Sequence, residues 1–190
     1  MKKEFRKNVI DKRKSQNLNL ISKKSHIIAK KILQLDCVKN AKTIMLYLNF
    51  DNEVQTNNLI KELISSNKIV ACPVTLKEER KLIPYQILNL ENGIKIGAYN
   101  IREPKVDECL KVDISDIDIV IVPAVAYDVN CYRLGYGGGF YDRFLEKLNP
   151  NAKTIGIAFD FQIFDEIPKE SHDAKLDFVV TESKIYTSQK

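Results

Sequence analysis

Short apolar runs alternate with amphipathic segments along most of the chain. Four segments repeat apolar positions at helical spacing: 3–14, 20–35, 56–66 and 140–147. Five short runs are rich in β-branched residues: 43–48, 68–74, 117–123, 154–159 and 177–181. Continuous apolar strands that alternate with helices are typical of a sheet buried on both faces. The pattern predicts an α/β fold, a layered, Rossmann-like sandwich whose mainly parallel (mixed) sheet is flanked by helices.

Residues 76–112 are less regular than the rest. The stretch "KLIPYQI" (81–87) could form an edge strand or a hairpin, and Gly93 and Gly97 indicate turns. The chain has no internal repeat, low-complexity segment or linker composition. We therefore expect residues 1–190 to form a single domain.

Polar or glycine-rich segments follow directly on four of the predicted strands. They are "NFDNEVQT", "AVAYDVNCYRLGYGGG", "DFQ" and "TES". Open parallel sheets bind ligands beyond the carboxyl ends of their strands. The sequence therefore predicts a ligand site built from these loops.

The composition narrows the class of protein. A hydrophobic fraction of 44% and a charged fraction of 29% are ordinary for a soluble globular protein. No apolar run approaches the ~18 residues of a membrane span, and the N-terminus has no signal-peptide pattern. The four cysteines are scattered and only two histidines are present, which argues against a zinc site. A cytoplasmic protein with reduced cysteines is expected.

The charge is distributed unevenly. Residues 1–31 contain eleven Lys or Arg and two acids, so the remainder of this +5 chain is net acidic. The basic segment could be a solvated helical face, a nucleic-acid patch, or a source of cations for an anionic small ligand. Composition alone does not separate these three interpretations.

The stretch "RLGYGGGFYDRFLEKL" (133–148) gathers four of the seven glycines into positions 135–139. A glycine loop that leads into a helix lets backbone N–H groups approach phosphate oxygens, and Arg133 could clamp the phosphate. The alternative is a tight turn that needs positive φ at two or three positions. The spacing matches neither a dinucleotide fingerprint nor a Walker A loop. We favour phosphate binding.

Two aspartates could hold magnesium beside such phosphates. Asp142 would lie in the first turn of the following helix, and Asp177 opens the last predicted strand. A hard cation that bridges nucleotide phosphates takes one or two protein carboxylates. Each aspartate also has a structural interpretation, which for Asp142 is favourable interaction with the helix dipole.

Four stretches together resemble the 5-formyltetrahydrofolate cyclo-ligase family. They are "KKEFR" (2–6), "LNFDNEVQT" (48–56), "VPAVAYDVNCYRLGYGGGFYDRFL" (122–145) and "IGIAFDFQIFDEIPKESHDAKLDFVVTE" (155–182). The likeness covers nearly the whole chain and is weakest over 76–112. Its glycine signature is specific, whereas the Lys-x-x-x-Arg start alone is not.

The resemblance implies a role for each matching position. The nucleotide phosphates would contact Lys2, Arg6, Arg133, Leu134, Gly135, Tyr136, Gly137, Gly138, Gly139, Phe140 and Tyr141, with Arg133 also acting in catalysis. The folate would contact Phe50, Gln55 and Tyr99. Magnesium would be held by Asp142 and Asp177. The sequence departs from the common family pattern at four positions: Gln55 replaces an acid, Cys131 a glycine, Phe140 a tyrosine and Gly138 a lysine.

The resemblance also implies the reaction: 5-formyltetrahydrofolate and ATP would give 5,10-methenyltetrahydrofolate, ADP and phosphate, with Mg²⁺. The small-molecule substrate would then account for the basic N-terminus, with no nucleic-acid or membrane partner, and a monomer is expected. Two alternatives belong to other classes. One is a sugar-phosphate isomerase or CoA transferase on a similar scaffold, without an ATP requirement. The other is a nucleic-acid-binding protein with a salt-sensitive basic helix.

Overall fold

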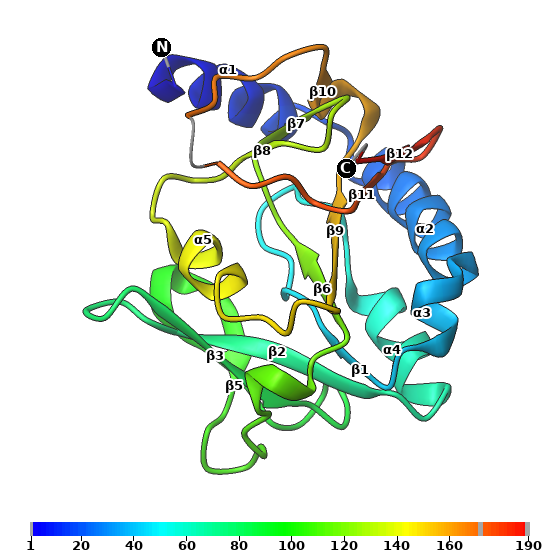
Figure 1. The fold of residues 1–190 in the computed structure, drawn as a ribbon, viewed down its shortest axis with the longest axis vertical. Helices are drawn as coiled ribbons and strands as arrows, with labels where there is room; N and C mark the ends of the chain where they lie inside the picture. Colours follow the sequence, from blue (N-terminus) through cyan, green and yellow to red (C-terminus); the bar gives the residue numbers. More distant parts are fainter. Residues whose placement is uncertain (1, 171–172, 189–190) are drawn as a thin grey trace.

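A seven-stranded sheet forms the centre of the protein (Figure 1). The computed structural model describes residues 2–170 and 173–188. The parallel strands are β1 (Thr43–Met45), β2 (Ile69–Leu76), β6 (Ile119–Val122), β9 (Lys153–Ile157) and β11 (Phe178–Val180). Antiparallel strands β3 (Lys81–Gln86) and β12 (Ile185–Thr187) close the two edges. The strand order is β12-β11-β9-β6-β1-β2-β3.

The structure confirms the α/β layered fold and all five predicted strands, which are neighbours in one sheet. The run 43–48 is shorter as a strand than predicted: the ladder of β1 ends at Met45, although Leu46 N still donates to Ala71 O at 2.9 Å. The "KLIPYQI" stretch forms β3, an edge strand paired with β2. Residues 46–48 therefore leave the sheet and are free to line a cavity.

Both faces of the sheet are covered, which explains the uninterrupted apolar runs. Alternate residues of each strand belong to two separate cores: Ile44 packs with Ile28 and Ile60, whereas Met45 packs with Tyr127 and Phe144. Three helices lie on the first face: α2 (Leu18–Gln34), α3 (Asp36–Asn40) and α4 (Asn57–Ser65). The second face carries α5 (Phe140–Leu145) and the segment that precedes it. The predicted helices 3–14, 20–35, 56–66 and 140–147 are thus all present.

Smaller elements that the pattern did not predict surround this sheet. A second sheet joins β7 (Ala126–Asp128), β8 (Arg133–Leu134) and β10 (Ile163–Phe164), and a hairpin joins β4 (Ile94–Ile96) to β5 (Arg102–Pro104). Single 3₁₀ turns occur at Ala98–Asn100, Ile114–Asp116 and Asp160–Gln162. The first helix, α1 (Lys2–Lys14), packs Val9 against the second sheet beside Leu134. This contact brings the N-terminus next to the glycine loop.

The strand order reverses between β1 and β6. From β1 the chain proceeds to β2 on one side, and later strands β6, β9 and β11 continue on the other. In doubly wound sheets the loops that leave such neighbouring strands diverge and open a crevice at their carboxyl ends. The fold therefore provides a binding site beyond β1 and β6.

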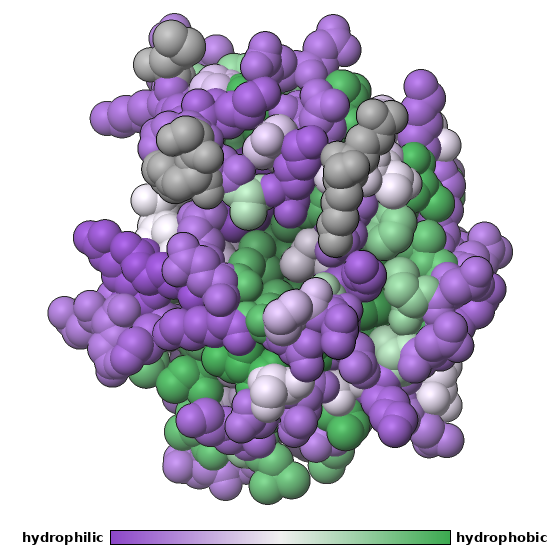
Figure 2. Space-filling model, in the orientation of Figure 1, coloured by the Kyte–Doolittle hydropathy of each residue, from purple (hydrophilic) through white to green (hydrophobic). Residues whose placement is uncertain are grey.

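The surface is mostly polar on the face seen in Figure 2, with hydrophobic side chains gathered near its middle. Within the described residues, no helix has both the length and the apolar character needed to cross a membrane. All four cysteines are free thiols, and Cys72 and Cys131 are buried. Burial raises the pKa of the Cys131 thiol to about 11, so this thiol is protonated at neutral pH.

Candidate functional site

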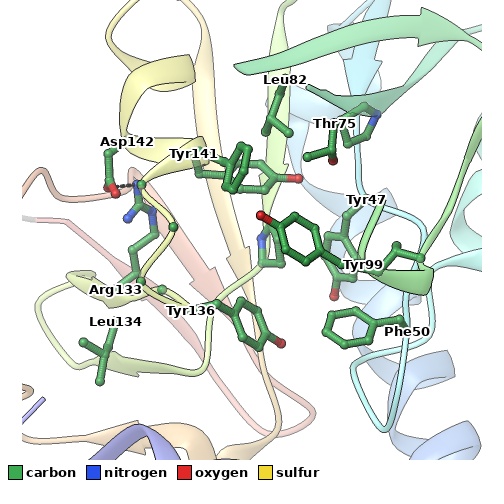
Figure 3. A pocket seen from close by; sticks show the side chains of 18 of the residues that line it. Tyr47, Phe50, Thr75, Leu82, Tyr99, Arg133, Leu134, Tyr136, Tyr141 and Asp142 are labelled. Atoms are coloured by element: carbon green, nitrogen blue, oxygen red, sulfur yellow. Dashed lines mark hydrogen bonds and ion pairs between the residues drawn. The ribbon is translucent and has the colours of Figure 1, made fainter. Parts of the chain in front are cut away.

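A cavity of about 680 Å³ lies at the carboxyl ends of the parallel strands. Leu48 after β1, Thr75 late in β2 and Pro123 after β6 form its floor. Its walls come from the glycine loop, the start of α1 and the segment 99–103. Figure 3 shows Arg133 and Asp142 on one side of the cavity and Thr75 and Phe50 on the other. A cavity thus lies where the strand–loop pattern predicts a ligand site, and the loops after β1 and β6 line it, whereas "DFQ" and "TES" do not.

The glycine loop combines the two interpretations that its sequence left open. Gly137 and Gly139 have φ values of 98° and 67°, so two of the four glycines do serve the turn. Among the described residues, however, none of the amides of residues 135–139 donates a hydrogen bond to a protein acceptor. A Cβ atom on Gly135 would meet nothing within 4 Å. The backbone N–H groups of this loop thus have no protein acceptor in the described part of the chain, which is what phosphate binding requires.

Three cations surround this loop. The Nε of Arg6 donates to Gly135 O at 2.8 Å, and the Arg133 guanidinium is paired with the Asp142 carboxylate. Lys2 Nζ lies 2.8 Å from Glu170 and 3.3 Å from Asp173. Burial acts to lower the pKa of Lys2, but its hydrogen bonds to these two carboxylates raise it overall. Arg133 Nε is buried and has no partner among the described residues, which leaves it available to an anion in the cavity.

A buried ion pair holds the loop in place. Arg13 and Glu53 are 2% and 5% exposed, and their charged groups lie 3.7 Å apart. Tyr136 reaches between them from the glycine loop: its hydroxyl accepts from Arg13 at 2.6 Å and donates to a Glu53 oxygen in a short hydrogen bond. The second oxygen of Glu53 accepts from Phe50 N at 3.2 Å. Burial raises the pKa of Glu53, and the nearby Arg13 opposes this shift.

Aromatic side chains form the remainder of the wall. Phe50 and Tyr136 have ring centroids 5.8 Å apart, and Tyr99 meets Phe140 edge-on at 6.1 Å. The Tyr141 hydroxyl is buried without a partner in the described part of the chain, and burial raises its pKa well above the ordinary value. Flat aromatic walls with a few polar groups are typical of a pocket for a planar ring. The cavity therefore offers an anion site at one end and a slot for a ring at the other.

The sequence comparisons agree with this geometry. A model of the 5-formyltetrahydrofolate cyclo-ligase family matches residues 1–182. The chain belongs to this family. It is similar to the 5-formyltetrahydrofolate cyclo-ligase of Escherichia coli (strain K12), with 35% identity over 154 residues that cover 77% of this chain and 81% of the relative. Its identity to the Mus musculus 5-formyltetrahydrofolate cyclo-ligase is 28%, over 84% of this chain and 83% of the relative.

A solved structure supports the same assignment. The NMR structure of the 5,10-methenyltetrahydrofolate synthetase of Aquifex aeolicus superposes with a TM-score of 0.87 at 30% sequence identity. The superposition covers 100% of this chain and 93% of that structure. The family resemblance in the sequence is therefore confirmed, and the cyclo-ligase fold extends over the whole chain.

Most site residues expected from the cyclo-ligase resemblance line one cavity. They are Lys2, Arg6, Phe50, Tyr99, Asp142 and the run Arg133, Leu134, Gly135, Tyr136, Gly137, Gly138, Gly139, Phe140 and Tyr141. Two expected residues, Asp177 and Gln55, are not among the lining residues. His172, one of the two histidines, lies outside the described residues.

The expected metal ligand Asp177 lies at the opposite edge of the sheet. It precedes β11, so it belongs to the amino end of a parallel strand, whereas the cavity lies at the carboxyl ends. Its carboxylate accepts from Thr154 N at 2.9 Å and from Thr154 Oγ1 at 3.0 Å. These bonds tie the start of β11 to the start of β9. Asp177 is therefore not among the residues that line this cavity, whereas Asp173 of the same segment is.

The expected folate contact Gln55 also lies outside the cavity. Its backbone N–H donates to Ser25 Oγ of α2 at 2.9 Å, which anchors the loop to the helix layer. Glu53, two residues earlier, is the acid that this loop contributes to the cavity. In sequence, Glu53 carries no local signal that distinguishes it from a solvated loop acid. Arg13 is likewise hard to recognise, because it lies in a basic run typical of a solvated helix face.

The donors present fit magnesium only together with a nucleotide. Among the described residues, no group of three or more His, Cys, Asp or Glu side chains could hold a metal ion. Asp142 and Asp173 line the anion end of the cavity. One or two carboxylates are sufficient when phosphate oxygens and water complete the octahedral shell of Mg²⁺. The site thus fits a nucleotide-bound magnesium ion rather than a permanent metal centre.

The Tyr136→Phe variant tests the buried pair. Without the hydroxyl, Glu53 and Arg13 each lose a hydrogen bond in a buried setting, so we expect the free energy of unfolding to fall by about 1–3 kcal/mol at neutral pH. The same bond lowers the pKa of Glu53. Its removal raises that pKa further above the ordinary 4.5, so the destabilisation should shrink as the pH falls toward 4.5. Urea unfolding at several pH values measures both effects.

Tyr132→Phe is the matched control, because the Tyr132 hydroxyl makes no hydrogen bond within the described residues and its ring faces Lys169. This variant should remain within about 0.5 kcal/mol of the parent protein at every pH. Equal, pH-independent losses in the two variants would contradict the bridging role of Tyr136.

Proposed function

We propose that this protein is an ATP- and Mg²⁺-dependent cyclo-ligase that converts 5-formyltetrahydrofolate to 5,10-methenyltetrahydrofolate, ADP and phosphate. The observation that carries the proposal is the open glycine loop beside Arg133 in the same cavity as an aromatic slot. An anion site and a site for a planar ring, side by side, suit a reaction between a nucleotide and a folate. Family membership and the names of the relatives support the substrate class.

The nucleotide phosphates bind along residues 134–139. Backbone N–H groups point at the phosphate oxygens, while Arg6 and Arg133 offset their charge. Arg6 is suited to this position because its bond to Gly135 O fixes the guanidinium against the loop. The folate ring lies against Phe50 and Tyr99 at the other end. This arrangement brings the γ-phosphate of ATP and the N5-formyl group together near Arg133.

The reaction begins with transfer of the γ-phosphoryl group to the formyl oxygen. That oxygen is part of an amide and is a poor leaving group until it is phosphorylated. N10 then attacks the formyl carbon, the C–O bond breaks and phosphate departs with the former formyl oxygen. The N10 proton is lost, and the methenyl bridge carries the positive charge. Positioning and charge stabilisation supply most of the catalysis in phosphoryl transfers of this kind.

The chain's own residues hold the reacting groups. Arg133 is 7% exposed, so its charge acts in a poorly solvated setting where it stabilises developing negative charge strongly. Asp142 orients this guanidinium. Asp142 and Asp173 would hold the nucleotide-bound magnesium, which neutralises phosphate charge when bound. The aromatic wall limits the access of water to the phosphorylated formyl group.

A direct assay tests the proposal. Purified protein mixed with 5-formyltetrahydrofolate, Mg²⁺ and ATP should show a rise in near-ultraviolet absorbance as the conjugated methenyl bridge forms. Omission of ATP should abolish the rise, which separates this activity from an isomerase or CoA transferase on the same scaffold. A flat trace from folded, ATP-binding protein would contradict the folate assignment. Tight binding to RNA or DNA with a steep salt dependence would favour the nucleic-acid alternative.

Arg133→Ala should reduce kcat by roughly 100-fold or more, since a buried cation at the transferred phosphoryl group is lost. Steady-state kinetics in the absorbance assay measure the effect. Arg80→Ala is the matched control, because Arg80 is exposed on the β2–β3 turn and does not line the cavity. Unchanged kcat in Arg133→Ala would reject the catalytic role of this residue.

A pair of aspartate variants tests the magnesium site. Asp142→Asn should raise the Mg²⁺ concentration needed for half-maximal activity, because one anionic ligand becomes neutral. Asp177→Asn should leave that concentration unchanged and lower stability instead, since it weakens the bonds to Thr154. A Mg²⁺ titration of each variant, with urea unfolding, separates the two effects. A shifted Mg²⁺ requirement in Asp177→Asn alone would restore the assignment made from the sequence.

A further inference from the structure

A second cavity, of about 380 Å³, lies between β3 and α5 on the second face of the sheet (Figure 1). The start of β3 and the segments 111–114 and 143–147 enclose it. Its floor is apolar, since Leu82, Val112 and Phe144 are 3–9% exposed and pack in one core cluster. Leu82 also lines the first cavity, so its side chain lies in the wall between the two. The proposed reaction does not use this second cavity.

The rim of the second cavity carries more positive than negative charge. Its charged side chains are Glu79, Lys81, Lys111, Asp113, Arg143 and Lys147. Glu79 is paired with Lys81, and Asp113 accepts from Ser115 N at 2.9 Å and from Ser115 Oγ at 2.8 Å. These hydrogen bonds lower the pKa of Asp113, and the charge of Lys111 adds to the effect. Both acids of the rim are therefore already engaged with near neighbours.

The other three cations of the rim lack such partners. In the part of the chain that the structure describes, Lys111, Arg143 and Lys147 form no ion pair with a carboxylate. Outside residues 1–31 the chain is net acidic, so this cluster is not part of a general excess of positive charge. A cleft lined by one sign of charge concentrates counter-ions. The second cavity is therefore suited to an anion.

Arg143 connects this cavity to the glycine loop. Its Nη1 donates to Gly138 O at 3.3 Å and to Gly139 O at 3.0 Å. The N–H and C=O of a trans peptide unit point in opposite directions, so these bonds turn the amides of Gly139 and Phe140 away from Arg143. The Nε and Nη2 groups of Arg143 donate no hydrogen bond within the described residues. One guanidinium can therefore hold the loop and bind an anion at the same time.

We propose that the second cavity is a regulatory site for a small, multiply charged anion that carries a phosphate group, and that this anion strengthens nucleotide binding at the glycine loop. Three unpaired cations match a dianion better than a single carboxylate charge. The anion takes the free donors of Arg143 and keeps Nη1 on the carbonyls of Gly138 and Gly139. A loop already held in one conformation binds its ligand more tightly, because less ordering remains to be paid. The coupling to the nucleotide, but not the anion site itself, rests on the proposed function.

The first test locates the anion, with inorganic phosphate as the probe and backbone amide NMR shifts as the readout. Phosphate should shift the amides of 111–114 and 143–147 in a saturable manner, and acetate should bind there more weakly because it carries one charge. The double variant Lys111→Gln/Lys147→Gln should weaken phosphate binding at these amides by about 2- to 30-fold, since two surface charge contacts are lost.

Lys23→Gln/Lys61→Gln is the matched control. These exposed lysines lie on α2 and α4, which cover the opposite face of the sheet, and their loss changes the net charge by the same amount. The control should keep the wild-type phosphate affinity at 111–114 and 143–147.

The second test measures the coupling. A saturating non-hydrolysable ATP analogue with Mg²⁺ occupies the glycine loop, so that added phosphate then reports on the second cavity alone. By linkage, the analogue should raise phosphate affinity there by the factor by which phosphate raises affinity for the analogue. One hydrogen-bonded contact corresponds to about 2- to 10-fold. Arg143→Lys, which keeps the charge but loses the planar fork, should still bind phosphate and lose most of this coupling.

The outcomes separate the two proposals. Absence of saturable shifts at 111–114 and 143–147, equal affinity for acetate, or an equal loss of phosphate affinity in the control would overturn the anion site. Phosphate affinity that does not rise when the analogue is bound would overturn the regulatory role. If the protein binds no ATP analogue, the proposed function falls and the coupling with it, whereas the phosphate shifts still decide the anion site.

Discussion

The buried contact among Arg13, Glu53 and Tyr136 is the constraint on which the site depends. These residues come from α1, from the loop after β1 and from the glycine loop, three segments far apart in the sequence. A buried charge pair is costly unless every partner is in place, so the three segments are stable together in one arrangement. Arg6, about two turns before Arg13 on α1, is thereby brought to Gly135. The position of the phosphate site thus follows from an interaction that touches no phosphate.

The topology of the sheet determines where α1, the loop after β1 and the glycine loop meet. Because the strand order reverses between β1 and β6, the segments that follow these strands diverge at one edge and leave a crevice. Tyr47, Leu48 and Pro123 form its floor, and the hairpin β4–β5 adds the outer wall with Tyr99 and Glu103. We propose that phosphates bind at the end of the cavity beside α1 and the folate ring at the end beside the hairpin. The central claim is that these two ends take different ligands.

The layered fold could be predicted from sequence because its signals are local. Each parallel strand is a short β-branched run between polar loops, and each helix carries its own apolar stripe. The same strand–loop pattern also predicted that the cavity would lie at the carboxyl ends of the parallel strands. The mixed second sheet could not be predicted in this way, since β8 and β10 have two residues each and β10 pairs with β7 from a distant part of the sequence, Ile163 opposite Tyr127. Such elements depend on tertiary contacts that no local pattern encodes.

The differences between the expected site residues and the residues that line the cavity have physical causes as well. Asp177 opens a parallel strand, and strand polarity alone places such a residue at the edge away from the ligand; Asp173, four positions earlier, lies on the loop that returns to the cavity. Arg13 resembles its solvated neighbours in sequence, and its burial beside Tyr136 and Glu53 arises from contacts with distant segments. Glu103 stood in the least regular part of the chain. Burial of a charged group is a tertiary property, so the residues with the most constrained environments were the hardest to predict.

Hydrogen exchange, followed by mass spectrometry, tests the central claim most directly. The protein would be measured alone, with a non-hydrolysable ATP analogue and Mg²⁺, and with 5-formyltetrahydrofolate. The account predicts that the ATP analogue slows exchange of the open amides in 134–139 and leaves 97–104 unchanged, while the folate slows exchange in 97–104. An ATP analogue that binds yet leaves 134–139 unchanged, or that protects 97–104 instead, would contradict the account.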